Sequence, residues 1–270
     1  MQIPRADYAV IGGSSTYSII FPEDLSLGGV EVISQGTVFS TPYGDSPPVK
    51  FFNLGGKKVA TVRMHGWRPG VTRAAASQQI FWVFREAGVK RIIADGGVGS
   101  VNHLLNPRDL LIPSDYIDMS MRKDVSLGGP YLLAMRQAVC PDIKNSLLKA
   151  SQKHYEGRIF DRGVYAVTDG RHFESRAEVV MLGRAGADVI GQSMCPEVYL
   201  AREIGACYGR VDIVVNYAEG VIRDWDHGEL KDIFYGLSQK VAQIVLSALA
   251  ELSGEQDCGC PELRRDTLLK

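Results

Sequence analysis

Polar side chains follow two apolar stretches in the second half of the chain, at the positions where strands would end. Gln192 and Ser193 come directly after the run Asp188–Gly191, and Asn216 closes the run Val211–Val215. Between the two runs, a Pro-Glu pair is followed by apolar residues at helical spacing, which predicts a helix that begins at this pair. Two strands joined by a helix are expected to run parallel, and ligands of open α/β sheets bind at the carboxyl ends of such strands. The spacing therefore places these side chains in one candidate site, although an ordinary strand–helix–strand unit with polar ends is the stronger interpretation from spacing alone.

Two further apolar runs end in small residues. The run Tyr8–Ile11 is followed by two glycines and Ser14, and the run Arg91–Ala94 is followed by an aspartate, Gly96 and Gly97. Glycines let the backbone approach a ligand closely, and exposed N–H groups in such a turn bind oxyanions. A plain tight turn explains the first of these patterns equally well.

The rest of the pattern alternates apolar strand-like runs with helical spacing, which predicts one α/β domain. We expect a hairpin of Val49–Leu54 and Lys58–Val62 around a Gly-Gly turn, and another strand within Asp109–Ile117. The predicted helices are Ala74–Ala87 with Gly88 as its C-cap, Ser146–Tyr155, Arg176–Arg184 and Lys231–Leu252. We assign residues 1–254 to this domain and residues 255–270 to a C-terminal tail that we expect to be poorly ordered.

Composition excludes several classes of function. The chain has 270 residues, enough to bury a sizeable core, and a net charge of −1, which gives no electrostatic reason to bind nucleic acid or an anionic membrane. No segment approaches the ~20 consecutive apolar residues of a membrane span. The first residues lack a secretory signal layout. We therefore expect a cytoplasmic protein.

The odd count of five cysteines and their wide spacing argue against a secreted disulfide framework. Cys258 and Cys260 stand close together, but the sequence shows no second pair of ligands with zinc-site spacing, so we expect no metal. A redox or disulfide role is an alternative. The favoured interpretation is a pair of cysteines in a frayed polar tail.

The motifs together resemble those of the nucleoside phosphorylase family, in its trimeric methylthioadenosine and purine nucleoside phosphorylase branch. The segment GADVIGQS followed by a Pro-Glu pair is similar to that family's GADVVGMT-x-PE. The other matches follow the family's order and, with this one, cover about residues 7–220. They are Ile11–Ser15, Thr41–Gly44, His65-Gly66, Val98–Ser100, Pro107–Asp118 and Asp169–Glu178.

The resemblance implies a single domain with a central mixed, curved β-sheet flanked by helices. It implies a homotrimer or a dimer of trimers, with a loop of the neighbouring subunit near Asp118–Pro141 completing the nucleoside pocket. Leu132 stands where relatives place a histidine in that loop. No cofactor is implied, because phosphate is the co-substrate. The implied phosphate-binding residues are Ser14, His65, Gly96, Gly97 and Ser193; the implied nucleoside-binding residues are Phe173, Gln192, Asn216, Ala218 and Glu219; Asn216 and His65 are the implied catalytic residues.

The departures from the family pattern cluster in the site. The arginine that precedes the family's histidine is replaced by Met64, which offers no charged fork to phosphate. Arg63, Arg68 or Arg73 are candidates to replace it. An aspartate before Gly96 would repel phosphate. Asn216 replaces the aspartate that marks the adenine-preferring branch, and Glu219 is placed to restore a carboxylate.

Three functions are compatible with this pattern. The first is phosphorolysis of a purine nucleoside, which needs an anion cradle, a pocket for an oxocarbenium-like ribose and a hydrogen bond to N7 of the departing purine. The second is hydrolysis, with water in place of phosphate. The third is nucleoside binding without catalysis.

Overall fold

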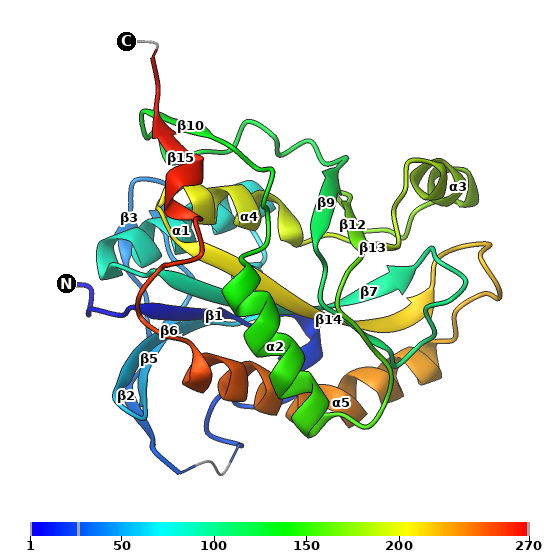
Figure 1. Cartoon of the computed structure of the whole chain (residues 1–270), viewed down its shortest axis with the longest axis horizontal. Helices are drawn as coiled ribbons and strands as arrows, with labels where there is room; N and C mark the ends of the chain where they lie inside the picture. Colours follow the sequence, from blue (N-terminus) through cyan, green and yellow to red (C-terminus); the bar gives the residue numbers. More distant parts are fainter. Residues whose placement is uncertain (1, 26–27, 269–270) are drawn as a thin grey trace.

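The computed structural model describes residues 2–25 and 28–268, and its centre is a mixed β-sheet with helices on both faces (Figure 1). The strands are β1 Tyr8–Ile11, β2 Val30–Thr37, β3 Ser40–Thr41, β4 Gly44–Asp45, β5 Val49–Leu54, β6 Lys57–Val62, β7 Arg91–Ser100, β8 Leu110–Leu111, β9 Asp115–Asp118, β10 Tyr131–Leu133, β11 Ile159–Phe160, β12 Val164–Val167, β13 Val189–Gly191, β14 Cys207–Tyr217 and β15 Arg264–Asp266. The helices are α1 Arg73–Ala87, α2 Pro141–His154, α3 Arg176–Arg184, α4 Met194–Glu203 and α5 His227–Glu251, with 3-10 turns η1 Ser14–Thr16, η2 Met64–Gly66 and η3 Pro261–Leu263.

The strand order along the main path of the sheet is β11-β8-β14-β7-β1-β6-β5-β2, and β12, β13 and β9 continue it from β7. The central strands β14, β7, β1 and β6 run parallel to one another, whereas β5 and β2 join antiparallel. The sheet is therefore mixed, as the resemblance implies, and residues on β14 are buried along its whole length.

One edge of β7 is shared by two strands that run toward each other. Strand β1 pairs in parallel with Arg91–Ala94, and β13 pairs antiparallel with Gly99 and Ser100 of the same edge. Both strands therefore point their carboxyl ends at the stretch between these pairings. Residues 95–98 of β7 pair with β14 on the other edge and with neither β1 nor β13 on this one.

This arrangement corrects the expectation that the two strands joined by α4 run parallel. Strand β14 runs parallel to β7 and β13 runs antiparallel to it, so the two run in opposite senses where they meet that strand. The physical reason is that β13 is a three-residue strand that pairs mainly with β12 and only touches the far end of β7. Gln192 and Asn216 still line the same cavity, because the ends of β13 and β14 both pair with β7 at Gly99.

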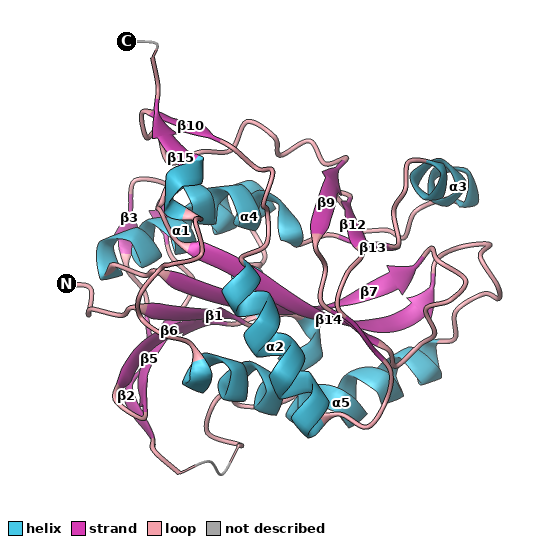
Figure 2. Cartoon of the chain, in the orientation of Figure 1, coloured by secondary structure: helices cyan, strands magenta, loops and turns pink. Residues whose placement is uncertain are grey.

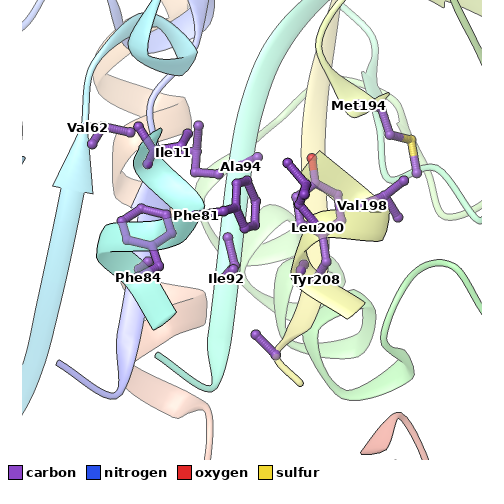
Figure 3. Packing of buried hydrophobic residues seen from close by; sticks show 14 of the residues in the cluster. Ile11, Val62, Phe81, Phe84, Ile92, Ala94, Met194, Val198, Leu200 and Tyr208 are labelled. Carbon is purple, nitrogen blue, oxygen red and sulfur yellow. The ribbon is translucent and has the colours of Figure 1, made fainter. Parts of the chain in front are cut away.

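Two apolar cores lie on opposite faces of the sheet, and Figure 2 shows the helices that cover each face. Helices α1 and α4 close the first core, where Phe81, Phe84 and Leu200 pack on strand residues such as Ile92 (Figure 3). Helices α2 and α5 close the second, with Leu147, Ile244 and their neighbours. A small third cluster lies beneath α3.

Several predicted elements are confirmed, and others extend further than expected. The hairpin around the Gly-Gly turn forms, and α1 ends at Gly88, whose φ of 83° is the left-handed conformation that glycine adopts without strain. The expected strand Arg91–Ala94 continues to Ser100, because the glycines after it pair with β14. The predicted strand within Asp109–Ile117 is two short strands, β8 and β9, and helix α5 begins four residues earlier than expected, at His227.

The expectation of a poorly ordered tail is wrong for residues 255–268. Strand β15 pairs antiparallel with β10, and Cys260 and Leu263 are buried. The buried Arg202 of α4 donates hydrogen bonds to the carbonyl oxygens of Cys260 at 2.8 Å and Gln137 at 2.5 Å. The prediction rested on the polar composition of the tail. Composition does not show that its few apolar side chains and its backbone groups contact the rest of the domain.

Among the described helices, α5 meets the length and hydropathy of a membrane span. Its apolar residues, including Ile233, Val241 and Val245, lie in the core between α5, α2 and the sheet. A core helix of a globular domain satisfies the same criteria, so the length and hydropathy of α5 do not indicate a membrane span.

Candidate active site

The sequence-predicted site residues converge on one cavity of about 250 Å³, at the gap on the edge of β7. The strand ends of β1, β13 and β14, turn η2 and helix α5 surround it. All ten predicted residues line it, and they are Ser14, His65, Gly96, Gly97, Phe173, Gln192, Ser193, Asn216, Ala218 and Glu219. Their roles toward a ligand remain predictions.

Serine hydroxyls form hydrogen bonds with the backbone of β7 at residues 95–98, where neither β1 nor β13 pairs with it. The Gly97 N–H donates to Ser14 Oγ at 3.0 Å, and Ser15 Oγ donates to the Gly96 carbonyl at 2.5 Å. A Cβ built on Gly13 would lie 2.1 Å from the Asp95 carbonyl oxygen, so only glycine permits this approach of η1 to β7. The gap is thus a concave surface of hydroxyl and backbone groups.

A buried ion pair supports the other hydroxyl of the predicted anion site. Arg210 Nη2 donates to Ser193 Oγ at 3.1 Å and to Asp212 Oδ1 at 2.5 Å, and Arg210 and Asp212 are both fully buried. A Cβ on Gly96 would lie 2.7 Å from Arg210 Nη2, so the glycine makes room for the guanidinium. Burial raises the pKa of Asp212, and the neighbouring Arg210 opposes that rise.

His65 is fixed in the cavity wall by a buried carboxylate. Its Nδ1 lies 2.7 Å from Glu197 Oε1, and Tyr208 donates to the other oxygen of Glu197 at 2.8 Å. With Nδ1 engaged, Nε2 is the ring nitrogen left for a ligand. His65 has a φ of 53°, and its neighbour Met64 has a φ of 50°, a conformation that is uncommon for residues other than glycine.

Aromatic and polar side chains form the opposite end of the cavity. The ring of Phe173 packs edge-on against Trp225, with centroids 5.1 Å apart, and Trp225 Nε1 donates to Glu219 at 2.8 Å. Gln192 accepts a hydrogen bond from Arg73 at 2.8 Å. Phe173 is about half exposed, so this end faces solvent.

Asn216 lines the cavity just after a register shift in the pairing of β14 with β7. Its side-chain Nδ2 donates to the Tyr217 carbonyl at 2.7 Å. Part of its donor capacity is therefore used within its own chain. One N–H of the amide and its carbonyl oxygen remain for a ligand.

Asp95 is the carboxylate beneath the predicted anion site. It is fully buried, Thr16 donates to its Oδ2 at 2.9 Å, and its Oδ1 has no hydrogen-bond partner among the described residues. Burial raises the pKa of Asp95 to about 6, against the opposing effects of the Thr16 hydrogen bond and of His65.

Comparison with known proteins identifies the fold family of this site. The model of the Phosphorylase superfamily matches residues 8–250. The chain belongs to the phosphorylase superfamily. This member is 31% identical to the 6-oxopurine nucleoside phosphorylase of Pyrococcus furiosus, over 94% of this chain and 96% of that protein. It is 29% identical to the S-methyl-5'-thioadenosine phosphorylase of Pyrococcus horikoshii, over the same shares of the two chains.

Solved structures support the same fold for this superfamily member. A methylthioadenosine phosphorylase from an Antarctic soil metagenomic library superposes with a TM-score of 0.79, at 24% identity, over 91% of this chain and 86% of that one. The methylthioadenosine phosphorylase of Schistosoma mansoni, in complex with adenine, gives a TM-score of 0.79 at 19% identity, over 93% of each chain.

The sequence suggested three arginines that could take over the role of the arginine that Met64 replaces. None of the three lines the cavity. Arg63 stacks on Tyr17 and donates to its carbonyl, and Arg68 donates to the carbonyl of Gly66 at 3.0 Å. Arg73 donates to the carbonyl of Asp169 at 2.5 Å and to Gln192 at 2.8 Å, and it stacks on the ring of Trp67, 3.9 Å from the centroid.

The residues that sequence reasoning missed are Arg210, Asp212 and Glu197. Arg210 and Asp212 are two residues apart on a strand, hence on the same face, within an otherwise apolar run. A charged pair at that spacing in a buried strand was the available signal. Nothing local in the sequence indicated that Glu197 contacts His65.

Within residues 2–25 and 28–268, a group of side chains with metal-ligand geometry lies away from the cavity. Cys140, Cys207, Cys258 and Cys260 hold their sulfur atoms within 4.8 Å of one another, at the opposite end of β14 from Asn216.

The raised pKa of Asp95 predicts a pH dependence of stability. The folded state holds the Asp95 proton more tightly than the unfolded chain does, with a pKa of about 6 against an ordinary 3.8. This stabilisation is present below about pH 4 and is lost as the pH rises through about 6, with a total of about 3 kcal/mol. We therefore expect Asp95→Asn to raise the free energy of unfolding at neutral pH and to have little effect near pH 4.

Urea unfolding at a series of pH values checks this prediction. The difference between Asp95→Asn and the parent should grow steadily across that window. Asp232→Asn, which changes an exposed aspartate of α5, is the control for the loss of one charge. A difference for Asp95→Asn that does not change with pH would contradict the assignment.

Proposed function

We propose that this protein cleaves the N-glycosidic bond of a purine nucleoside with phosphate, as a pentosyltransferase of the purine nucleoside phosphorylase type that needs no cofactor. One observation carries the proposal: the hydroxyls of Ser14 and Ser193 and the backbone of Gly96 and Gly97 meet at one end of a cavity in a chain of this superfamily. The relatives named as phosphorylases of 6-oxopurine nucleosides and of methylthioadenosine support the substrate class.

The hydrogen bonds of the two serines suit an anion. Ser14 Oγ accepts from the Gly97 N–H, and Ser193 Oγ accepts from Arg210. An oxygen that accepts in this way keeps its own hydrogen to donate. A phosphate oxygen placed between the two hydroxyls would receive both hydrogens. Arg210 thus serves the anion through Ser193, while its charge remains paired with Asp212.

The reaction itself needs little covalent chemistry from the protein. A phosphate oxygen forms a bond to C1′ of the ribose as the bond from C1′ to the purine nitrogen breaks, and the electron pair moves onto the purine. In this proposal Asn216, which lines the cavity, holds a hydrogen bond at N7 of the departing base. His65, whose Nδ1 is engaged by Glu197, contacts the phosphate or the ribose through Nε2 in this proposal. The aromatic end, with Phe173, would cover the base.

The charge balance of the cavity favours one alternative, hydrolysis. The described residues that line the cavity include Glu174 and Glu219 but no lysine and no arginine. A phosphate dianion therefore gains less here than in a site with an arginine fork. If phosphate does not bind, water at the same position would attack C1′.

Restoring the arginine at position 64 tests the choice between phosphate and water. A charge-assisted hydrogen bond contributes about 1.5–3 kcal/mol, so Met64→Arg should lower the KM for phosphate by about tenfold or more and raise the rate of phosphorolysis. The rate is measured as base released from inosine, adenosine and methylthioadenosine, with and without phosphate.

Met64→Gln is the matched control, because it supplies a polar chain of similar length without the charge. Its KM for phosphate should stay close to that of the parent. If Met64→Arg brings no gain and the parent cleaves nucleosides without phosphate, the hydrolase is the correct assignment.

Asn216 leads us to expect a preference for 6-oxopurine nucleosides. An amide can donate to the six-position carbonyl and present its own carbonyl to N7–H, whereas an aspartate only accepts and suits the amino group of adenine. The bond from Asn216 to the Tyr217 carbonyl leaves one N–H for this purpose. Asn216→Asp should shift the ratio of kcat/KM for adenosine over inosine toward adenosine by about tenfold, or 1.4 kcal/mol.

Asn53→Asp, on β5, adds the same charge away from the cavity and should leave the ratio unchanged. A parent that prefers adenine nucleosides by more than about tenfold would overturn the argument from Asn216. Glu219→Gln then tests whether that carboxylate selects adenine instead.

We also propose that the protein is a homotrimer or a dimer of trimers. Exposed apolar side chains support an interface on the segment that follows β9 and includes β10, where Met121 is 86% and Leu132 is 63% exposed. Leu132 brings no polar group, so the contact of a neighbour with the nucleoside would be apolar. Analytical ultracentrifugation should give a species of about 90 kDa or a multiple of it. A single species near the chain mass of 29.6 kDa would contradict the proposal.

A further inference from the structure

Four cysteines from three distant parts of the chain meet at the edge of the sheet far from the cavity. Cys140 is the N-cap of α2, Cys207 is the first residue of β14, and Cys258 and Cys260 lie in the C-terminal segment. Their sulfur atoms all lie within 4.8 Å of one another, and those of Cys207 and Cys258 are 3.4 Å apart. Figure 1 shows this segment, in red, running back from α5 across the sheet.

We propose that these four thiolates bind one zinc ion, in a structural site that fastens the C-terminal segment to the domain. Zinc bound by four cysteines is tetrahedral with Zn–S bonds of about 2.3 Å, which places the sulfur atoms about 3.8 Å apart. The sulfurs thus need to move by less than about 1 Å to reach this geometry. Each cysteine releases its proton to solvent as its sulfur binds the ion.

The surroundings suit a cluster that carries negative charge. A zinc ion with four thiolates has a net charge of −2, and the buried guanidinium of Arg91 lies beside it, with Nη1 3.6 Å from Cys140 Sγ. The Nε atom of Arg91 is buried and has no hydrogen-bond partner in the part of the chain that the structure describes. Cys140 also stands at the N-terminus of α2, where the helix dipole favours an anion.

Amide donors complete a second layer of contacts. Gln256 Nε2 lies 3.3 Å from Cys207 Sγ, and Gln137 Nε2 lies 3.7 Å from Cys260 Sγ. Hydrogen bonds of this kind orient the ligands of metal sites and stabilise their charge. Gly259 has a φ of 73°, which allows the tight turn between Cys258 and Cys260 and directs both sulfurs to one point.

The site is closed and remote from catalysis. Cys140, Cys207 and Cys260 are buried, and all four tetrahedral positions are taken by protein, which is the pattern of structural rather than catalytic zinc. Eight residues of β14 lie between Cys207 and Asn216, a span of about 30 Å. The expectation of no metal arose because sequence spacing revealed only the Cys258 and Cys260 pair.

Metal content of the full-length protein tests the proposal. The protein is expressed with zinc in the medium, purified with a non-thiol reductant and without chelator, and analysed by elemental mass spectrometry. We expect about one zinc ion per chain. The double variant Cys258→Ser with Cys260→Ser should retain less than about a tenth of that content, because only two ligands remain. Cys195→Ala removes the fifth cysteine, which lies outside the cluster, and should keep the full content.

Cobalt provides a second readout, and its positive result is obtained on the parent protein. Co²⁺ added to the metal-free parent should give thiolate-to-cobalt charge-transfer absorption and the intense visible bands of a tetrahedral site. The double variant should lack both. A chelator should also lower the Tm of the parent and leave that of the double variant unchanged.

Other outcomes would overturn the proposal. One is a metal-free parent with five titratable thiols after denaturation. Another is a metal-free parent, prepared without reductant, that has one titratable thiol, which indicates two disulfides. An equivalent of iron in place of zinc would equally exclude the assignment. These measurements use no nucleoside, so they stand or fall independently of the proposed reaction.

Discussion

The candidate site depends on the shared edge of β7. Because β1 and β13 pair with the two ends of this edge and run toward each other, residues 95–98 are left without a strand partner there. Backbone groups buried without partners are costly, and the hydroxyls of Ser14 and Ser15 supply the missing hydrogen bonds to Gly97 and Gly96. The same hydroxyls and glycines then form the wall of the cavity.

Packing around this gap explains why so many glycines surround it. Gly13 lets η1 approach the Asp95 carbonyl, Gly96 leaves space for Arg210, and a Cβ on Gly97 would lie 2.6 Å from Phe234 of α5. Each glycine therefore admits a neighbour that another residue would displace. The absence of a side chain at these glycines therefore does two things. It lets neighbouring elements pack closely, and it leaves the backbone accessible to a ligand.

Electrostatics distinguish this site from a simple anion cradle. Arg210 is paired with Asp212, and Asp95 and Glu197 lie close by in the protein interior. The positive charge that reaches the cavity is thus largely compensated. An arginine at the position of Met64 would contact a ligand directly, whereas Arg210 acts through Ser193. The protein therefore relies on hydroxyl and backbone donors at the place where a guanidinium would be the stronger partner.

The two ends of β14 have separate tasks. Its carboxyl end carries Asn216 to the cavity, and its amino end carries Cys207 to the thiol cluster. The strand between them is buried throughout and pairs with both β7 and β8. The length of this strand keeps the chemistry of the two regions apart.

Local pattern in the sequence determined much of this protein. Apolar runs, caps and glycine turns located β1, the hairpin of β5 and β6, and α1, and the order of the motifs indicated the family and the ten cavity residues. Tertiary structure alone decided that β13 opposes β14, that Arg210 supports Ser193, and that the tail packs on the domain. It also brought together Cys140, Cys207 and Cys258. The reason is physical: periodicity reports which face of an element is buried, but contacts between residues far apart in the chain depend on how elements pair, and they leave no local signal.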